Sequence, residues 1–133
     1  MRLHGDVALF TAYFDNVLSR VNSEKKTCYI SGDYNINLLK CDTHISTSDF
    51  ANCIFSHSFL PPVNKPTRIT DYTATLIDNI ITNASLVNSI SAIICADISE
   101  HFPVFLQTSS AVKPTVKPRF IYKHNFSEKK KIS

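Results

Sequence analysis

The sequence predicts an α/β domain, because segments with helical periodicity and segments with strand character alternate along the chain. Apolar residues recur at helical spacing over residues 6–21. Runs rich in β-branched and aromatic residues follow, which favour strands. These runs occupy residues 27–30, 73–82, 89–96 and 102–106. A helix followed by several short strands is typical of helices layered on a sheet.

The first helix is amphipathic, and we interpret its apolar stripe as a core-facing surface rather than a partner site. The stripe comprises Val7, Leu9, Phe10, Tyr13, Phe14, Val17, Leu18 and Val21. A polar break over residues 22–26 leads into the strand at residues 27–30, which we expect Ser31 and Gly32 to end.

The next predicted element is a short helix over residues 49–56, after a loop over residues 40–47. The hydroxyl residues at 46–48 supply its N-cap. His57 follows the helix, and we interpret it as a helix-terminus residue rather than a metal ligand. Residues 59–63 contain two prolines, so they form an edge strand or an extended connector.

One carboxylate interrupts the apolar strand predicted at residues 73–82. Asp78 must be paired or hydrogen-bonded to be tolerated there, so we expect a partner for it. The last two strands flank a turn over residues 97–101 that contains two acids and His101. If this turn and Asp33 share one end of the sheet, three acids and a histidine converge there.

Composition fits one small globular domain. The chain has 133 residues, of which 44% are hydrophobic and 19% charged, so wholesale disorder is excluded. The net charge of +3 comes largely from the end of the chain, so it is a weak indication of nucleic-acid binding. Residues 1–108 form the predicted domain, and serines and prolines mark residues 109–133 as a basic linker or tail.

The four cysteines form no Cys-x-x-Cys pair and no zinc-type array with histidine. Cys28 and Cys95 lie in apolar runs, where we expect buried, reduced thiols rather than a disulfide framework. The sequence shows no signal peptide and no run as long as a membrane span. These features predict a soluble, intracellular protein with no membrane partner.

The candidate site begins at the end of the first strand. In an extended chain, Asp33, Asn35 and Asn37 share one face. Their oxygens suit a hard divalent cation and its phosphate ligand. Gly-Asp-x-Asn is also ordinary turn chemistry, so both interpretations stay open. Likewise, Lys65 and Arg68 either bind backbone phosphates or are simply solvated.

Three separate motifs resemble the endonuclease/exonuclease/phosphatase superfamily, and in particular the apurinic-type endonuclease domain of non-LTR retrotransposons. They are ISGDYN at residues 30–35, PTRIT at 66–70 leading into TLIDNI at 75–80, and DISEHFPVF at 97–105. The resemblance implies a two-sheet α/β sandwich. It also implies Mg²⁺- or Mn²⁺-dependent cleavage of phosphodiester bonds in DNA.

The resemblance also implies roles for individual residues. Asp33 orients or deprotonates the attacking water, and Asn35 holds a phosphate oxygen or the metal shell. His101 stabilises charge on the phosphoryl oxygens, and Asp78 orients it. Glu100 stands where the family usually has Asp, and a shift of about 1 Å in a ligand can cost roughly 10²-fold in rate. The implied metal ligands are Asp33, Asn35, Glu100 and His101. Lys65 and Arg68 stay the candidate phosphate contacts that their own chemistry indicates.

The principal metal-binding residues in the amino-terminal half of the family have no matching motif here. The resemblance therefore predicts a partial sandwich that lacks its amino-terminal part, with impaired activity. The implied partners are DNA, that missing half or a reverse transcriptase domain, and the implied location is the nucleus. Two alternatives stay open: an inactive remnant that binds nucleic acid weakly, and a phosphatase of the same superfamily.

Overall fold

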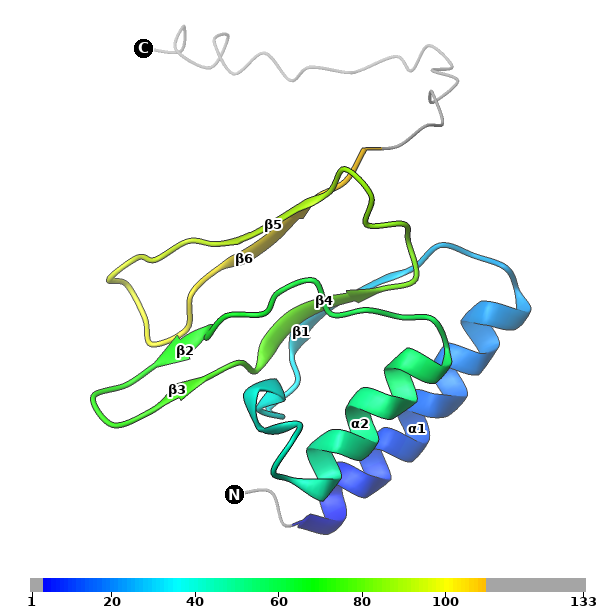
Figure 1. The fold of residues 1–133 in the computed structure, drawn as a ribbon, viewed down its shortest axis with the longest axis horizontal. Coiled ribbons are helices and arrows are strands. Elements are labelled where there is room, and N and C mark those ends of the chain that lie inside the picture. Colours follow the sequence, from blue (N-terminus) through cyan, green and yellow to red (C-terminus); the bar gives the residue numbers. More distant parts are fainter. Residues whose placement is uncertain (1–3, 110–133) are drawn as a thin grey trace, which may run out of the picture.

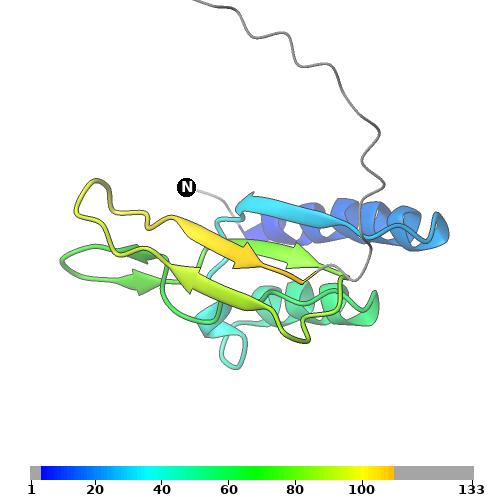
Figure 2. The same cartoon turned by 90° about the horizontal axis from the view of Figure 1, so that it is seen from above.

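Two helices pack on one side of a two-stranded antiparallel ladder, and a β-hairpin lies alongside that ladder, away from the helices (Figure 1). This computed structural model describes residues 4–109 and has mixed α/β architecture, as the sequence predicts. The predicted basic tail falls almost entirely outside the described residues. Figure 2 shows the same layers from above.

The first helix, α1, spans His4–Ser23 and confirms the predicted amphipathic segment. The second helix, α2, spans Ile45–Ser56, so the predicted start at residue 49 was wrong. Ser48 N already donates to His44 O at 2.9 Å, which places the hydroxyls of residues 46–48 inside the helix. His44 occupies the N-cap position without a side-chain capping bond. His57 is the C-cap, at the helix terminus where we expected it.

The hydrophobic core lies between the two helices and the ladder. Aromatic rings from both helices and from the end of the first strand pack with centroids 5.5–6.4 Å apart. These rings belong to Phe10, Phe14, Tyr34 and Phe50. Leu18, Phe50, Ile54, Phe59 and Ile81 are completely shielded from solvent. The apolar stripe of α1 is therefore a core surface, although Leu9, Tyr13 and Val17 remain exposed.

Strand β1 spans Tyr29–Asp33 and pairs antiparallel with β4, Asp78–Thr82. The prediction that Ser31 and Gly32 end this strand was wrong, because both residues pair in the ladder, Gly32 with Asn79. The extension carries the ladder as far as Asp33, and it makes Asp33 a strand residue rather than a turn residue.

The predicted strand over residues 73–82 is divided into β3, Ala74–Thr75, and β4. The backbone at Leu76 and Ile77 hydrogen-bonds outside both ladders. Leu76 N donates to Asn37 Oδ1 at 3.0 Å, and Ile77 O accepts from Tyr34 N at 2.8 Å. Hydrogen bonds to a side chain and to a loop therefore take the place of strand pairing at Leu76 and Ile77. As a result, β4 begins at Asp78.

The remaining strands form hairpins. β2, Arg68–Ile69, pairs with β3, while β5, Ile90–Ile93, pairs with β6, Val104–Gln107. β5 and β6 confirm two predicted strands with narrower bounds. Residues 59–63 form the predicted extended connector, and Leu60 bridges to Thr82 at the edge of β4. A short 3-10 helix, η1, Leu38–Lys40, precedes the predicted loop and overlaps it only at Lys40.

All four cysteines are free, which confirms the expected absence of disulfides. Cys28 is half-buried, but Cys95 is exposed, so the expectation of a buried thiol at Cys95 was wrong. Cys95 lies just beyond β5, outside the core layer. No helix within residues 4–109 has the length and apolar character needed to cross a membrane.

Candidate active site

Two carboxylates face each other at one end of the β1–β4 ladder. Asp33 is the last residue of β1, Asp78 is the first of β4, and the two are direct cross-strand partners. Residues directly opposite in an antiparallel pair project to the same face, and like charges in this arrangement repel. The ladder therefore concentrates negative charge at a point where a cation lowers the electrostatic energy.

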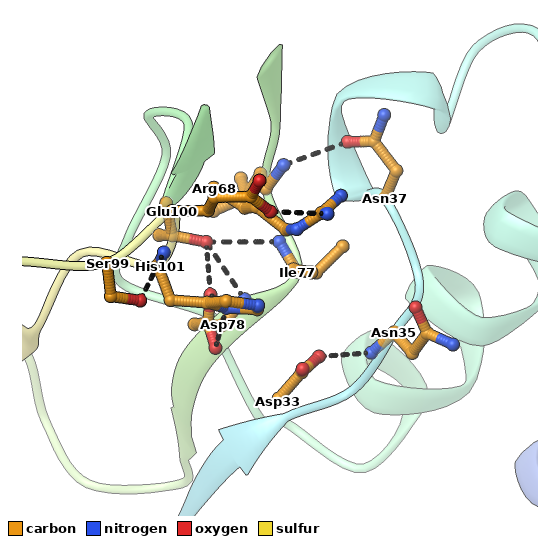
Figure 3. Close-up of polar contacts among 11 residues, drawn as sticks. Asp33, Asn35, Asn37, Arg68, Ile77, Asp78, Ser99, Glu100 and His101 are labelled. Atoms are coloured by element: carbon orange, nitrogen blue, oxygen red, sulfur yellow. Dashed lines mark hydrogen bonds and ion pairs between the residues drawn. The ribbon is translucent and has the colours of Figure 1, made fainter. Parts of the chain in front are cut away.

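His101 completes this group from a different part of the chain. Its Nδ1 lies 3.1 Å from Asp78 Oδ2 and 3.4 Å from Asp78 Oδ1 (Figure 3). Ligand atoms of Asp33, Asp78 and His101 all lie within 4.8 Å of one another. Of the predicted convergence, Asp33 and His101 are brought together, but the second acid of the group is Asp78 rather than Asp97 or Glu100. Asp78 has the partner that its place in a strand requires.

Backbone pairing with β2 fixes the position of His101. Arg68 and His101 form an isolated antiparallel bridge, and Phe102 N donates to Thr67 O at 2.7 Å. His101 N also donates to Ser99 Oγ at 3.0 Å. The histidine is therefore held by its own backbone as well as by its ring contact with Asp78.

Thr67 is a site residue that sequence reasoning did not single out. Its side chain is completely buried, and its hydroxyl donates to Asp78 Oδ2 at 2.8 Å. The Thr67 hydroxyl oxygen, Oγ1, accepts from Ile77 N at 3.2 Å and from Asp78 N at 3.0 Å. The only sequence feature that could have indicated Thr67 is its place in the PTRIT motif at residues 66–70. Thr67 thereby fixes both the backbone and the carboxylate of Asp78.

Asp33, Asn35 and Asn37 were expected to share one face of an extended chain, but their side chains do not converge on one point. Asn35 has a φ of 51°, a left-handed conformation that asparagine tolerates, so the chain leaves the strand geometry here. Its backbone N–H donates to Asp33 Oδ1 at 2.8 Å, which is the Asx-type turn contact weighed above. Figure 3 shows the Asn35 amide directed away from Asp78 and His101. Asn37 instead caps η1 and bonds Leu76.

Arg68 and Glu100 bind each other beside the group. Arg68 Nη2 donates to Glu100 Oε2 at 2.7 Å, with 34% and 60% of the respective side chains exposed. Glu100 is not part of the group of ligand atoms formed with Asp33. Lys65 is exposed and lies along a different surface, a cavity of about 430 Å³ that is bordered by Pro66 and Phe102. The predicted metal role of Glu100 and the predicted phosphate roles of Arg68 and Lys65 stay predictions.

The acid and histidine group lies outside the two cavities that adjoin the turn between β5 and β6. The cavity of about 560 Å³ is lined by the turn from Cys95 to Glu100, together with Ile69 and Phe102. Neither it nor the 430 Å³ cavity includes Asp33, Asp78 or His101. This arrangement suits a substrate that lies across the surface better than a small ligand enclosed in a pocket.

Comparison with protein-family models gives no match for this chain, and comparison with curated proteins gives none either. The residues and their geometry are therefore the basis on which we infer a function.

Proposed function

We propose that this chain carries a phosphodiester hydrolase site of the DNA endonuclease type, formed by Asp33, Asp78 and His101. The observation that supports it most strongly is the cross-strand pair of carboxylates with His101 bound to one of them. We also propose that the α/β fold is part of a two-sheet sandwich, since the hairpin β5–β6 lies alongside β4.

The donor set fits Mg²⁺ or Mn²⁺. Mg²⁺ is usually held by one or two carboxylates and retains several waters, and carboxylates also suit Mn²⁺. Asp33 and Asp78 would supply the carboxylates, with His101 beside them and the Asn35 amide directed away from the group (Figure 3). When bound, such an ion neutralises developing phosphoryl charge and acidifies its water.

The side chains of the chain have separate tasks in this proposal. Asp33 is exposed and accepts hydrogen bonds, so it serves as the base that orients and deprotonates the attacking water. His101 keeps Nδ1 on Asp78, an orientation in which Nε2 can donate a hydrogen bond to the phosphoryl oxygens. Thr67 and Asp78 act as positioning residues that hold the ring in this orientation.

The open position of the group favours a polymeric phosphodiester over a small phosphomonoester. Arg68 lies next to His101 through the backbone bridge and offers a guanidinium for a flanking phosphate. Its ion pair with Glu100 must loosen for that contact, so substrate binding and this pair compete.

Nicking of supercoiled plasmid by the full chain tests the proposal. We expect nicking that requires Mg²⁺ or Mn²⁺, stops with chelator and is lost in Asp33→Asn. Asp42→Asn changes an exposed carboxylate outside the group and serves as the matched control. Absence of metal-dependent nicking, with salt-dependent DNA binding retained, supports the inactive remnant instead. Faster turnover of a phosphomonoester than of plasmid supports a phosphatase.

A further inference from the structure

A second group of side chains that could hold a metal ion comes from the two helices. Asp15 comes from α1, Cys53 from α2, and His57 is the C-cap of α2. Their ligand atoms all lie within 4.8 Å of one another. The group shares no residue and no strand with the site at Asp33.

We propose that Asp15, Cys53 and His57 form a zinc-binding site that bridges α1 and α2. Thiolate sulfur, imidazole nitrogen and carboxylate oxygen are the three ligand types that Zn²⁺ takes in proteins. Cys53 and His57 are four residues apart, the spacing that puts two side chains on one face of a helix.

The distances fit a tetrahedral ion after small movements. His57 Nε2 lies 2.6 Å from Asp15 Oδ1, and Cys53 Sγ lies 3.7 Å from the same oxygen. Ligand atoms around tetrahedral zinc are separated by about 3.5 Å, given bonds of roughly 2.0–2.3 Å. A zinc ion therefore replaces the hydrogen bond between His57 and Asp15, and these two atoms separate by about 1 Å.

The site is held in place and open to solvent. The Asp15 side chain is 53% exposed, whereas that of His57 is 16% exposed. Asn22 Nδ2 donates to His57 O at 2.9 Å, which ties the end of α2 to α1. Three protein ligands leave the fourth position of a tetrahedral zinc ion for water. Because the Asp15 carboxylate is exposed, an ion can reach the site from solvent.

The same geometry argues against a nucleophilic cysteine. The nearest polar partner of Cys53 is the Asp15 carboxylate, and a negative neighbour disfavours a free thiolate. An activated cysteine needs the opposite environment, whereas a metal ion supplies the missing positive charge itself.

The two sites also differ in the metal ion that their ligands prefer. Mg²⁺ prefers oxygen ligands and binds sulfur poorly, so the thiol at Cys53 selects against it. The site at Asp33 contains two carboxylates and an imidazole, without sulfur. A readout specific to sulfur therefore reports on the helix site alone.

Titration of the full, reduced chain with Co²⁺, a spectroscopic substitute for Zn²⁺, tests the proposal. We expect one equivalent with a thiolate-to-cobalt charge-transfer band that Zn²⁺ abolishes. Cys53→Ser should lose the band, and the matched variant Cys95→Ser, at an exposed cysteine, should keep it. A missing band in the folded wild type, or an unchanged band in Cys53→Ser, overturns the proposal.

A measurement on the wild type covers the case in which Cys53→Ser fails to fold. Zn²⁺ should slow alkylation of Cys53 at least tenfold, measured by peptide mass spectrometry, and leave the rate at Cys95 unchanged. Mg²⁺ should protect neither residue. Equal rates at Cys53 with and without Zn²⁺ overturn the proposal, as does protection by Mg²⁺.

Discussion

Asp33 and Asp78 are direct partners across the β1–β4 ladder, so two carboxylates face each other at the end of a sheet. Thr67 and His101 engage Asp78, while Asp33 accepts a hydrogen bond from the Asn35 backbone and remains exposed. One carboxylate of the pair is therefore compensated by side chains and the other lies open to solvent. This asymmetry underlies the separate roles proposed for the two residues.

Asp33→Asn should stabilise the metal-free chain, because it removes one of two facing charges. We expect a gain of about 0.2–1 kcal/mol in the free energy of unfolding in chelator. Mg²⁺ should stabilise the wild type and have little effect on the variant. Urea denaturation with and without Mg²⁺ measures both effects. A variant that is less stable than wild type in chelator contradicts the repulsion.

Thr67→Val should destabilise the fold, because valine leaves two buried backbone N–H groups without their acceptor. The expected loss is about 1–3 kcal/mol in the free energy of unfolding. Thr67→Ser keeps the hydroxyl and loses one methyl group, so it should cost about 1 kcal/mol or less. Denaturant unfolding of the two variants side by side makes the comparison. Equal stability of both variants would rule out a structural role for the hydroxyl.

Arg68→Gln should weaken DNA binding if Arg68 contacts a phosphate as proposed. The slope of log affinity against log salt should fall by about one, because one fewer counterion is released. Arg20→Gln, at the far end of α1, is the control and should leave the slope nearer the wild-type value. Fluorescence anisotropy at several salt concentrations gives the slopes. An unchanged slope in Arg68→Gln would contradict the proposed phosphate contact, and Arg68 would then only form a surface ion pair with Glu100.

Tyr34 should make the fold sensitive to alkaline pH. Burial, with a smaller contribution from Cys28, raises the pKa of Tyr34 well above its ordinary value of 10.0. The unfolded chain therefore loses this proton near pH 10 while the folded chain keeps it, so stability falls as pH rises above about 10.

Tyr34→Phe removes this titration, and its stability should fall less steeply above pH 10 than that of the wild type. At neutral pH the variant should be less stable by about 0.5–1.5 kcal/mol, because the hydrogen bond to Ile30 O is lost. Tyr72→Phe, at a residue that is 94% exposed, should follow the wild type. Unfolding measured between pH 7 and pH 12 separates the three curves, and parallel curves for wild type and Tyr34→Phe contradict the argument.

Local sequence pattern predicted several elements of this fold. The spacing of Phe14 and Leu18 predicted α1, and the β-branched runs predicted β5 and β6. Boundaries that depend on distant partners were not predictable. Leu76 is not part of a strand because its backbone hydrogen-bonds to Asn37 and to the backbone of Leu38, in the loop after β1. Local residue propensities carry no information about these long-range contacts.

The site divides in the same way. The sequence by itself determined the candidate site residues: a carboxylate after an apolar run, a carboxylate that needs a partner, and a histidine in an acidic turn. Only the tertiary structure decided the register that sets Asp33 opposite Asp78, the burial of Thr67 and the pairing of Arg68 with Glu100. It also brought His57, interpreted from sequence as a helix terminus, next to Asp15 and Cys53. The reason is physical: residue type fixes what a side chain can bind, while long-range backbone pairing and packing fix which side chains meet.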